Sequence, residues 1–359
     1  MSRVRSSPLV AAMGIAASTL LLLVVMLAAG GFDVGAALSA LVSGAAGSPT
    51  AFLSGTLVRA TPLLLTGLAV TVAFQAGVLN IGAEGQLLAG AAVATAVGLG
   101  VPAGLLTVLL ALAAGASAGA AWAAIAAVLR QRFGVLEVIS TIMLNFVAQL
   151  TVAWLVRGPL QEPSHIYPQS EALPMVARLP ALVPGTRLHW GFALGVAAAF
   201  AASFVMRRTA AGFRLRVVGA NPFAAAVAGR INATRVAFGA FVVSGALAGL
   251  AGATEVGGVT FALYETLSPG YGYSAIAVAL LARLDARLVI LSAVLFGGLE
   301  AGAVAMQRDA GVPSVVVNVV EATLILMVLA ASRLDALMGS VDDTTLAPEA
   351  GPPTRDRPR

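Results

Sequence analysis

Long apolar segments separated by short polar ones are the feature of this sequence that most restricts its fold. Of the 359 residues, 59% are apolar and only 10% are charged, whereas a soluble domain carries about 25% charged residues. A helix needs roughly 20 apolar residues to cross a bilayer core of about 30 Å. The sequence therefore predicts an all-α, polytopic integral membrane protein with about ten spans. The candidate spans are residues 8–29, 60–79, 85–100, 103–129, 137–156, 190–206, 236–256, 270–282, 288–306 and 313–331.

The arginines test this number of spans, because membrane proteins concentrate basic residues in their cytoplasmic loops. All 21 basic residues are arginine. With the N-terminus inside, ten spans place most of them in the cytoplasm, and the same bias holds along the whole chain. We therefore predict that both termini are cytoplasmic. The arginines left outside are Arg59, Arg157, Arg178, Arg187 and Arg308.

The sequence divides into a transmembrane domain and a short tail. Residues 1–338 form the domain, and residues 339–359, which are acidic and then rich in Pro and Arg, predict a disordered cytoplasmic tail. Within the domain, residues 157–188 carry six prolines and predict an outer loop. Residues 34–58 are half-apolar and interrupted by Gly and Pro, which predicts an outer-face helix or loop.

The cytoplasmic loop 207–235 contains a short helix that is predicted from its ends. Asn221 is a favourable N-cap, Pro222 suits the first helical position, and Gly229 supplies the left-handed residue that ends a helix. A helix of about seven residues is not stable alone in water. Either it packs on the protein's own inner face, or it docks on a cytoplasmic partner. The candidate docking residues are Arg216, Gly219, Asn221, Pro222, Phe223, Ala224, Ala225 and Gly229.

Two Gly-rich interruptions indicate where a solute would cross. Three glycines between residues 77 and 85 prevent a regular helix there, and broken backbone at membrane depth must be buried or line a cavity. The alternative is a tight turn with Glu84 in water. Residues 257–282 carry a similar interruption, and a pair of such segments points to a transporter's binding region. The candidate pathway residues are Phe74, Gln75, Asn80, Glu84, Gln86, Asn145 and Tyr273.

The sequence lacks the motifs of most catalytic and metal sites. It has no cysteine and two histidines, which argues against a Cys- or His-ligated metal, and no phosphate-binding Gly-Lys motif. We expect no enzyme activity and no directly bound cofactor. The arginines lie between apolar segments, so the net charge of +5 does not indicate a nucleic acid partner. A secondary transporter of small polar solutes, driven by an ion gradient, stays open as an alternative.

Seven motifs carry a resemblance to a known family. The most specific is Asn-Ile-Gly-Ala-Glu-Gly-Gln at residues 80–86, and the others are residues 59–68, 133–139, 141–146, 218–222, 244–249 and 272–281. With these motifs the sequence resembles the permease subunits of bacterial ABC importers in the branched-chain amino acid, ribose and nucleoside group. It looks most like the simple-sugar and nucleoside permeases.

The resemblance implies a subunit that translocates nucleosides or related simple sugars across the bacterial cytoplasmic membrane by ATP-driven alternating access. The implied partners are membrane lipid, a second and related permease, a cytoplasmic ATPase with two nucleotide-binding cassettes, and an extracytoplasmic lipoprotein that delivers substrate. The ATPase, and not this chain, uses the ATP. The resemblance also implies that the short helix at 221–229 sits in a groove of the ATPase.

Overall fold

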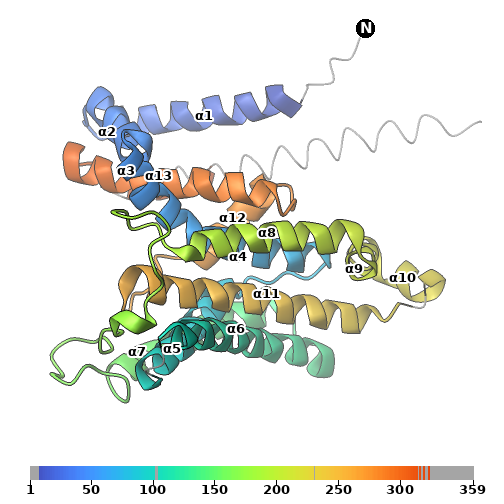
Figure 1. Cartoon of the computed structure of the whole chain (residues 1–359). Helices are drawn as coiled ribbons and strands as arrows, with labels where there is room; N and C mark the ends of the chain where they lie inside the picture. The colour runs from blue at the N-terminus through green and yellow to red at the C-terminus, as the bar shows by residue number, and fades with distance from the viewer. Residues whose placement is uncertain are drawn as a thin grey trace, which may run out of the picture.

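The computed structural model describes residues 8–101, 104–229, 231–313, 315–316, 318–319 and 322–323. Within these residues the chain is helical, with isolated β-bridges as its only extended pairing, which confirms the predicted all-α class. The longer helices lie alongside one another, and most run along one common direction (Figure 1). The elements are α1 (Pro8–Ala29), α2 (Val34–Ala46), α3 (Pro49–Ala51), η1 (Phe52–Thr56), α4 (Leu57–Gln75), α5 (Ala83–Gly100), α6 (Leu105–Phe133), α7 (Glu137–Val156), η2 (Met175–Ala177), α8 (Trp190–Arg208), α9 (Ala210–Ala220), α10 (Pro222–Gly229), α11 (Ala233–Glu255), η3 (Val256–Thr260), α12 (Tyr271–Leu281) and α13 (Leu288–Ala310).

The predicted spans correspond to helices of the structure. Each of the first nine coincides with a helix, and the tenth, 313–331, lies largely outside the described residues, as does the tail at 339–359. Among the described residues, six continuous helical stretches are long and apolar enough to cross a membrane. The expected start of the second span at residue 60 is wrong, because α3, η1 and α4 form one continuous helix from Pro49 to Gln75. Of the stretch 34–58, for which the sequence predicts a helix or loop, Val34–Ala46 form α2, and the residues from Pro49 onward belong to the helix that ends at Gln75.

The two ends of the bundle differ in charge. We call the right-hand end in Figure 1 the arginine-rich end: it holds α9, α10, the C-terminal ends of α6 and α8, and the α12–α13 turn. The opposite end holds the loop 157–188, and we call it the loop end. Nine of the 14 described arginines lie at the arginine-rich end. This grouping is the one that the ten-span topology requires.

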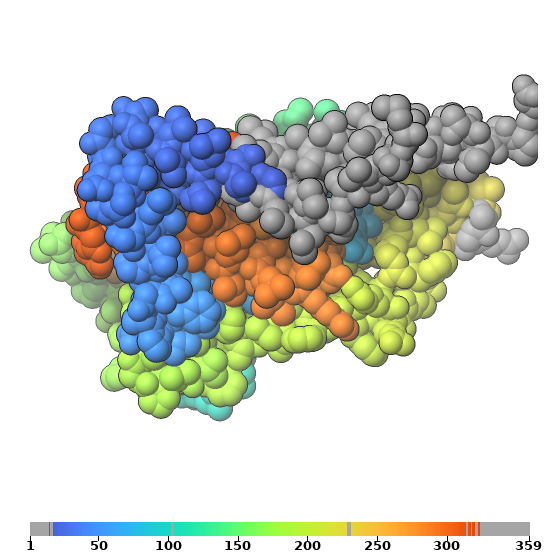
Figure 2. Space-filling model, turned by 90° about the horizontal axis from the view of Figure 1, so that it is seen from above, coloured from blue at the N-terminus to red at the C-terminus, as the bar shows by residue number. Residues whose placement is uncertain are grey.

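The N-terminal helices pack on one side of this bundle. α2 lies along α13, where Leu27, Ala40 and Met306 are buried in a common apolar cluster. Figure 2 shows these first helices in blue against the orange α13. These N-terminal helices cover one side of α13 in its loop-end half.

Close contacts between backbones hold the centre of the bundle together. α11 packs against α4, α5 and α6 through a row of small residues. At Gly249 an added Cβ would lie 2.8 Å from the Cα of Gly119 on α6. Small residues let helices approach closely in a membrane, where packing replaces the hydrophobic effect as the force between helices. The stripe of small residues on α11 is therefore an interhelical contact.

Replacing Gly249 with valine should destabilise the fold, because the new side chain overlaps the α6 backbone. Overpacking of this kind costs about 1–3 kcal/mol. Thermal unfolding in detergent measures the effect, with Gly239→Val as the matched control. Gly239 lies on the same helix and has no atom within 4 Å of an added Cβ. Equal midpoint shifts for the two variants would contradict the packing assignment.

Candidate functional site

Two interrupted segments meet deep inside the bundle. Residues 76–82 connect α4 to α5, and residues 261–270 connect η3 to α12. α12 ends at the arginine-rich end, where the Gln75 side chain at the end of α4 donates a hydrogen bond to the Leu284 carbonyl at 2.7 Å. The 11 residues of α12 rise about 16 Å, roughly half of a bilayer core. The N-terminus of α12 therefore lies near mid-depth.

The first turn of α5 lies directly against the first turn of α12. A Cβ on Gly272 would lie 2.5 Å from the Cα of Glu84, and a Cβ on Gly85 would lie 2.9 Å from the Cα of Asn145 on α7. The start of α5 is thus enclosed between α12 and α7. A helix N-terminus carries unpaired N–H groups and the positive end of the helix dipole. Two such ends meet at this junction.

The Glu84 side chain supplies hydrogen-bond acceptors at the junction of the two helix ends. Its carboxylate accepts the Gly272 N–H at 2.7 Å and also bonds the Ser268 hydroxyl. Ser268 Oγ in turn accepts the N–H groups of Gly270 and Tyr271, both at 3.1 Å. Only 7% of Glu84 is exposed. The alternative of a turn with Glu84 in water is therefore wrong, because this side chain caps a neighbouring helix inside the bundle.

A second set of buried polar groups supports the break before α5. The side-chain amides of Asn80 and Gln86 pair reciprocally, each nitrogen donating to the other's oxygen at 2.9 Å. Asn80 also donates to Ser244 Oγ at 2.8 Å, and its oxygen accepts the Gly82 N–H at 2.9 Å. Ser244 donates to the Ala69 carbonyl at 2.7 Å. These residues replace the hydrogen bonds that a continuous helix would provide.

Asn145 joins α7 to the same junction. Its oxygen accepts the Gly85 N–H at 2.8 Å, while its nitrogen donates to the Ile81 carbonyl at 3.0 Å and to Tyr273 Oη at 3.2 Å. Asn145 is buried, whereas Tyr273 is 43% exposed. Among the seven predicted pathway residues, Tyr273 alone has an exposed side chain.

The structure brings five of the seven predicted pathway residues into one hydrogen-bonded junction. Phe74 is half-buried and packs beside this junction against an apolar cluster that contains Ala83 and Ala275. Gln75 lies apart from it, at the arginine-rich end, where its contact with Leu284 holds a turn. The junction residues are Asn80, Glu84, Gln86, Asn145 and Tyr273.

Sequence reasoning missed three polar residues near this junction. Ser244 lies in a stripe typical of helix packing and Ser268 precedes a proline, so neither spacing indicates its contacts. Gln149 lies one helical turn beyond Asn145 on α7, is exposed, and has no hydrogen-bond partner within the described residues. The only signal for Gln149 is its i+4 spacing from Asn145.

At the arginine-rich end, α9 rests on the segment that leads to the junction. Gly77 has a φ of +70°, and a Cβ there would lie 3.2 Å from the Cα of Gly219. A Cβ on Gly219 would lie 2.9 Å from the carbonyl carbon of Gln75. The two backbones are in contact, so a displacement of α9 reaches the chain three residues before Asn80.

The loop 207–235 forms two helices, whereas its sequence predicts one. Thr209 caps α9 by accepting the Gly212 N–H at 3.2 Å, a contact that sequence reasoning overlooked. The predicted helix is α10: it begins at Pro222, and Asn221 Oδ1 accepts the Ala224 N–H at 2.9 Å, so the predicted cap is confirmed. Gly229 is the last residue of α10, and its prediction as the left-handed residue beyond the helix is wrong.

The surface of α10 is apolar and faces outward. Phe223 is 79% exposed and Val227, one turn later, is 69% exposed. Ala225 is 1% exposed, so its place in the candidate docking set is wrong: it packs inward, and its carbonyl accepts the Ile231 N–H at 3.1 Å. Arg216, another residue of the candidate docking set, lines a hollow beside Gln75.

At the loop end, the loop 157–188 is hydrogen-bonded to η3 and to the segment 261–270 that follows it. The Leu173 N–H donates to the Phe261 carbonyl at 2.7 Å, and the Leu179 N–H donates to the Gly257 carbonyl at 2.8 Å. The Arg178 guanidinium lies 4.5 Å from the centre of the Phe261 ring. Each interrupted segment is therefore held by a surface element at its own end of the bundle.

Comparison with known proteins gives a consistent set of matches. Residues 52–330 match the family described as branched-chain amino acid transport system / permease component. The chain is 41% identical to the glucose ABC transporter permease protein TsgB13 of Haloferax volcanii, covering 77% of this chain and 76% of that protein. It is 37% identical to the guanosine ABC transporter permease protein NupP of Bacillus subtilis, over 93% and 95% of the two chains. It is 31% identical to the nucleoside ABC transporter permease protein NupB of Lactococcus lactis, over 76% and 78%. No solved structure matches the chain significantly.

The capping role of Glu84 predicts a graded effect of substitution. Glu84→Leu leaves the buried Gly272 N–H without an acceptor, which costs about 1–3 kcal/mol, whereas Glu84→Gln keeps an acceptor oxygen and should cost less. Thermal unfolding in detergent measures both. Equal, near-zero shifts for the two variants would show that Glu84 does not cap α12.

Proposed function

The chain belongs to the branched-chain amino acid transport permease family, and we propose that it carries nucleosides or related simple sugars as the permease subunit of an ABC importer. The observation that carries this proposal is the family match across residues 52–330. The buried polar junction supports it, because interrupted helices at mid-depth are typical of transporter binding regions.

The substrate class follows from the relatives and from the chemistry near Tyr273. Their names specify guanosine, nucleosides and glucose, and a nucleoside combines a sugar with a base. The exposed Tyr273 ring offers an aromatic surface for a base. The Gln149 amide offers a donor and an acceptor for a base edge or a hydroxyl. We assign both residues to the wall of the pathway.

The partner ATPase docks on α10 in this proposal. The arginine-rich end faces the cytoplasm, because basic residues mark cytoplasmic loops, and this orientation puts both termini in the cytoplasm of a bacterial cell. Phe223 and Val227 then form an exposed apolar surface on the cytoplasmic side. An eight-residue helix of this kind fits a groove on the ATPase, which uses the ATP while this chain binds none.

Two further partners complete the importer. A binding lipoprotein delivers substrate at the loop end, against residues 157–188. A second, related permease covers the exposed apolar side of α7, where Phe146, Leu150 and Trp154 are each more than half exposed. The pathway then runs between the two permeases, past Tyr273.

The contacts suggest how ATP drives transport. ATP binding shifts α10 and with it α9, whose Gly219 bears on Gly77. The segment 76–82 then moves the junction of α5 and α12, and the pathway opens toward the other side. The binding protein acts from the loop end through the contact of Leu173 with Phe261. The ATPase and the binding protein therefore act on the same two helix ends, the N-termini of α5 and α12.

Reconstituted uptake tests this function. Proteoliposomes that contain the chain, its ATPase, its second permease and its binding lipoprotein should accumulate labelled guanosine or glucose only with ATP, and a protonophore should not abolish uptake. ATP-independent, protonophore-sensitive uptake would favour an ion-gradient-driven carrier instead.

The docking surface on α10 is tested in the same system. Phe223→Asp combined with Val227→Asp should abolish copurification of the ATPase and reduce uptake at least tenfold, because two charges replace the apolar contact. Ile166→Asp is the control for copurification: Ile166 is 71% exposed, but at the loop end. Normal copurification of the ATPase with the double variant would contradict the assignment of α10.

A further inference from the structure

A basic hollow lies on the side of the bundle where α8 meets the start of α13. It has a volume of about 520 Å³ and is lined by Ser203, Phe204, Arg207, Arg208 and Arg287. An adjoining hollow of about 280 Å³ lies next to Arg207 and adds Arg216 and Arg283. Both hollows are at the arginine-rich end, where the headgroups of one lipid leaflet would lie.

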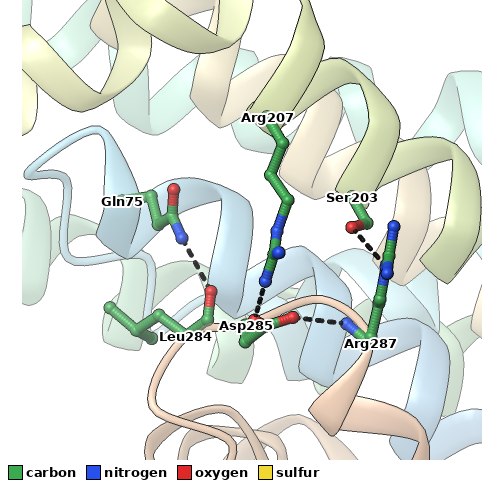
Figure 3. Close-up of polar contacts among 6 residues, drawn as sticks. All are labelled: Gln75, Ser203, Arg207, Leu284, Asp285 and Arg287. Atoms are coloured by element: carbon green, nitrogen blue, oxygen red, sulfur yellow. Dashed lines mark hydrogen bonds and ion pairs between the residues drawn. The ribbon is translucent and has the colours of Figure 1, made fainter.

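Polar contacts fix the arrangement of this hollow (Figure 3). Arg207 forms an ion pair with Asp285, whose other oxygen accepts the backbone N–H of Arg287 at 2.9 Å. The Arg287 Nε donates to Ser203 Oγ at 2.9 Å. Ser203 is only 3% exposed, so a buried hydroxyl group holds the Arg287 guanidinium in place. Its two terminal nitrogens bond no acceptor in the part of the chain that the structure describes.

Positive charge exceeds negative charge around these hollows. Five arginines face one carboxylate, that of Asp285, which is already paired with Arg207. Arg208, Arg216 and Arg283 have no carboxylate partner among the described residues. The N-terminus of α13, which begins at Leu288, adds the positive end of a helix dipole. Such a group favours an anion with several oxygens, because guanidinium groups bind phosphate through paired hydrogen bonds.

Apolar side chains extend from Arg208 on α8 and from Arg287 on α13 toward the middle of the bundle. On α8, Phe204 and Phe200 precede Arg208 at intervals of four residues and are 62% and 54% exposed. On α13, Leu291 and Leu295 follow Arg287 at the same interval and are 68% and 48% exposed. Residues four apart share a helix face. Each helix therefore presents a stripe that begins with an arginine and continues with exposed apolar side chains.

Figure 2 shows α13 in orange directly beside the yellow-green α8 on one face of the molecule, and the two helices are in contact. We propose that these two stripes form a binding site for an anionic phospholipid. The phosphate lies between Arg208 and Arg287, and an acyl chain follows the exposed side chains of both helices. A free phosphate would use the arginines but not the apolar stripes. The combination of the two identifies a lipid, in keeping with basic pockets between transmembrane helices that bind anionic headgroups.

Native mass spectrometry of the intact transporter in detergent tests this site. The probes are phosphatidylglycerol and phosphatidylcholine with identical acyl chains, and inorganic phosphate. We expect the protein to bind phosphatidylglycerol at least tenfold more tightly than phosphatidylcholine. Arg208→Gln combined with Arg287→Gln should remove this preference. Arg132→Gln combined with Arg235→Gln, which changes two exposed arginines at the same end of the bundle, should keep it.

Substitution of the apolar stripes distinguishes a lipid from a free anion. Phe204→Ser combined with Leu291→Ser should weaken binding of phosphatidylglycerol about tenfold or more and leave thermal unfolding nearly unchanged, because both side chains are exposed. The proposal is wrong if the wild type binds the two lipids equally, or if the control pair loses the preference as the test pair does. It is also wrong if inorganic phosphate at equal concentration displaces the bound lipid.

Discussion

The meeting of two helix N-termini near mid-depth is the constraint on which the rest of this structure depends. A bilayer core offers no water to the unpaired N–H groups of such helix ends, so protein must satisfy them. Here the Glu84 carboxylate accepts the Gly272 N–H, and the paired amides of Asn80 and Gln86 hold the chain before α5. The glycines at 85 and 272 let the three helices approach closely enough for these bonds to form. Removing any of these groups exposes a polar atom where no substitute exists.

The same arrangement gives the molecule a movable centre. A continuous helix would transmit a push along its own axis, whereas an interrupted helix shifts where its backbone is broken. Each break is held by an element at one surface: Gly219 of α9 touches Gly77, and Leu173 of the loop 157–188 bonds Phe261. An importer needs signals from both sides of the membrane to reach one place. The two breaks provide such a place, and Tyr273 extends from it to the accessible surface.

The sequence alone predicts which helices this fold contains better than it predicts the contacts between them. Apolar length identified the spans, and the N-terminal cap of α10 was predicted because Asn221 and Pro222 act locally. The glycines indicated where the helices break, and their polar neighbours Asn80, Glu84 and Gln86 were identified with them. The contacts of Ser244 with Asn80 and of Ser268 with Glu84 were missed because the two residues of each pair lie far apart along the chain. Ala225 was placed on the wrong side of α10, since an alanine on a short, Ala-rich helix carries no sign of which face is buried.

Accessibility of position 273 tests the central claim most directly. The chain has no cysteine, so Tyr273→Cys creates a single reactive thiol beside the junction. In the assembled transporter, a membrane-impermeant thiol reagent added to one side should label this cysteine in the nucleotide-free state, and reagent added to the opposite side should label it when ATP is bound without hydrolysis. Labelling from the same side in both states would show that the junction is a static support and that the pathway opens elsewhere.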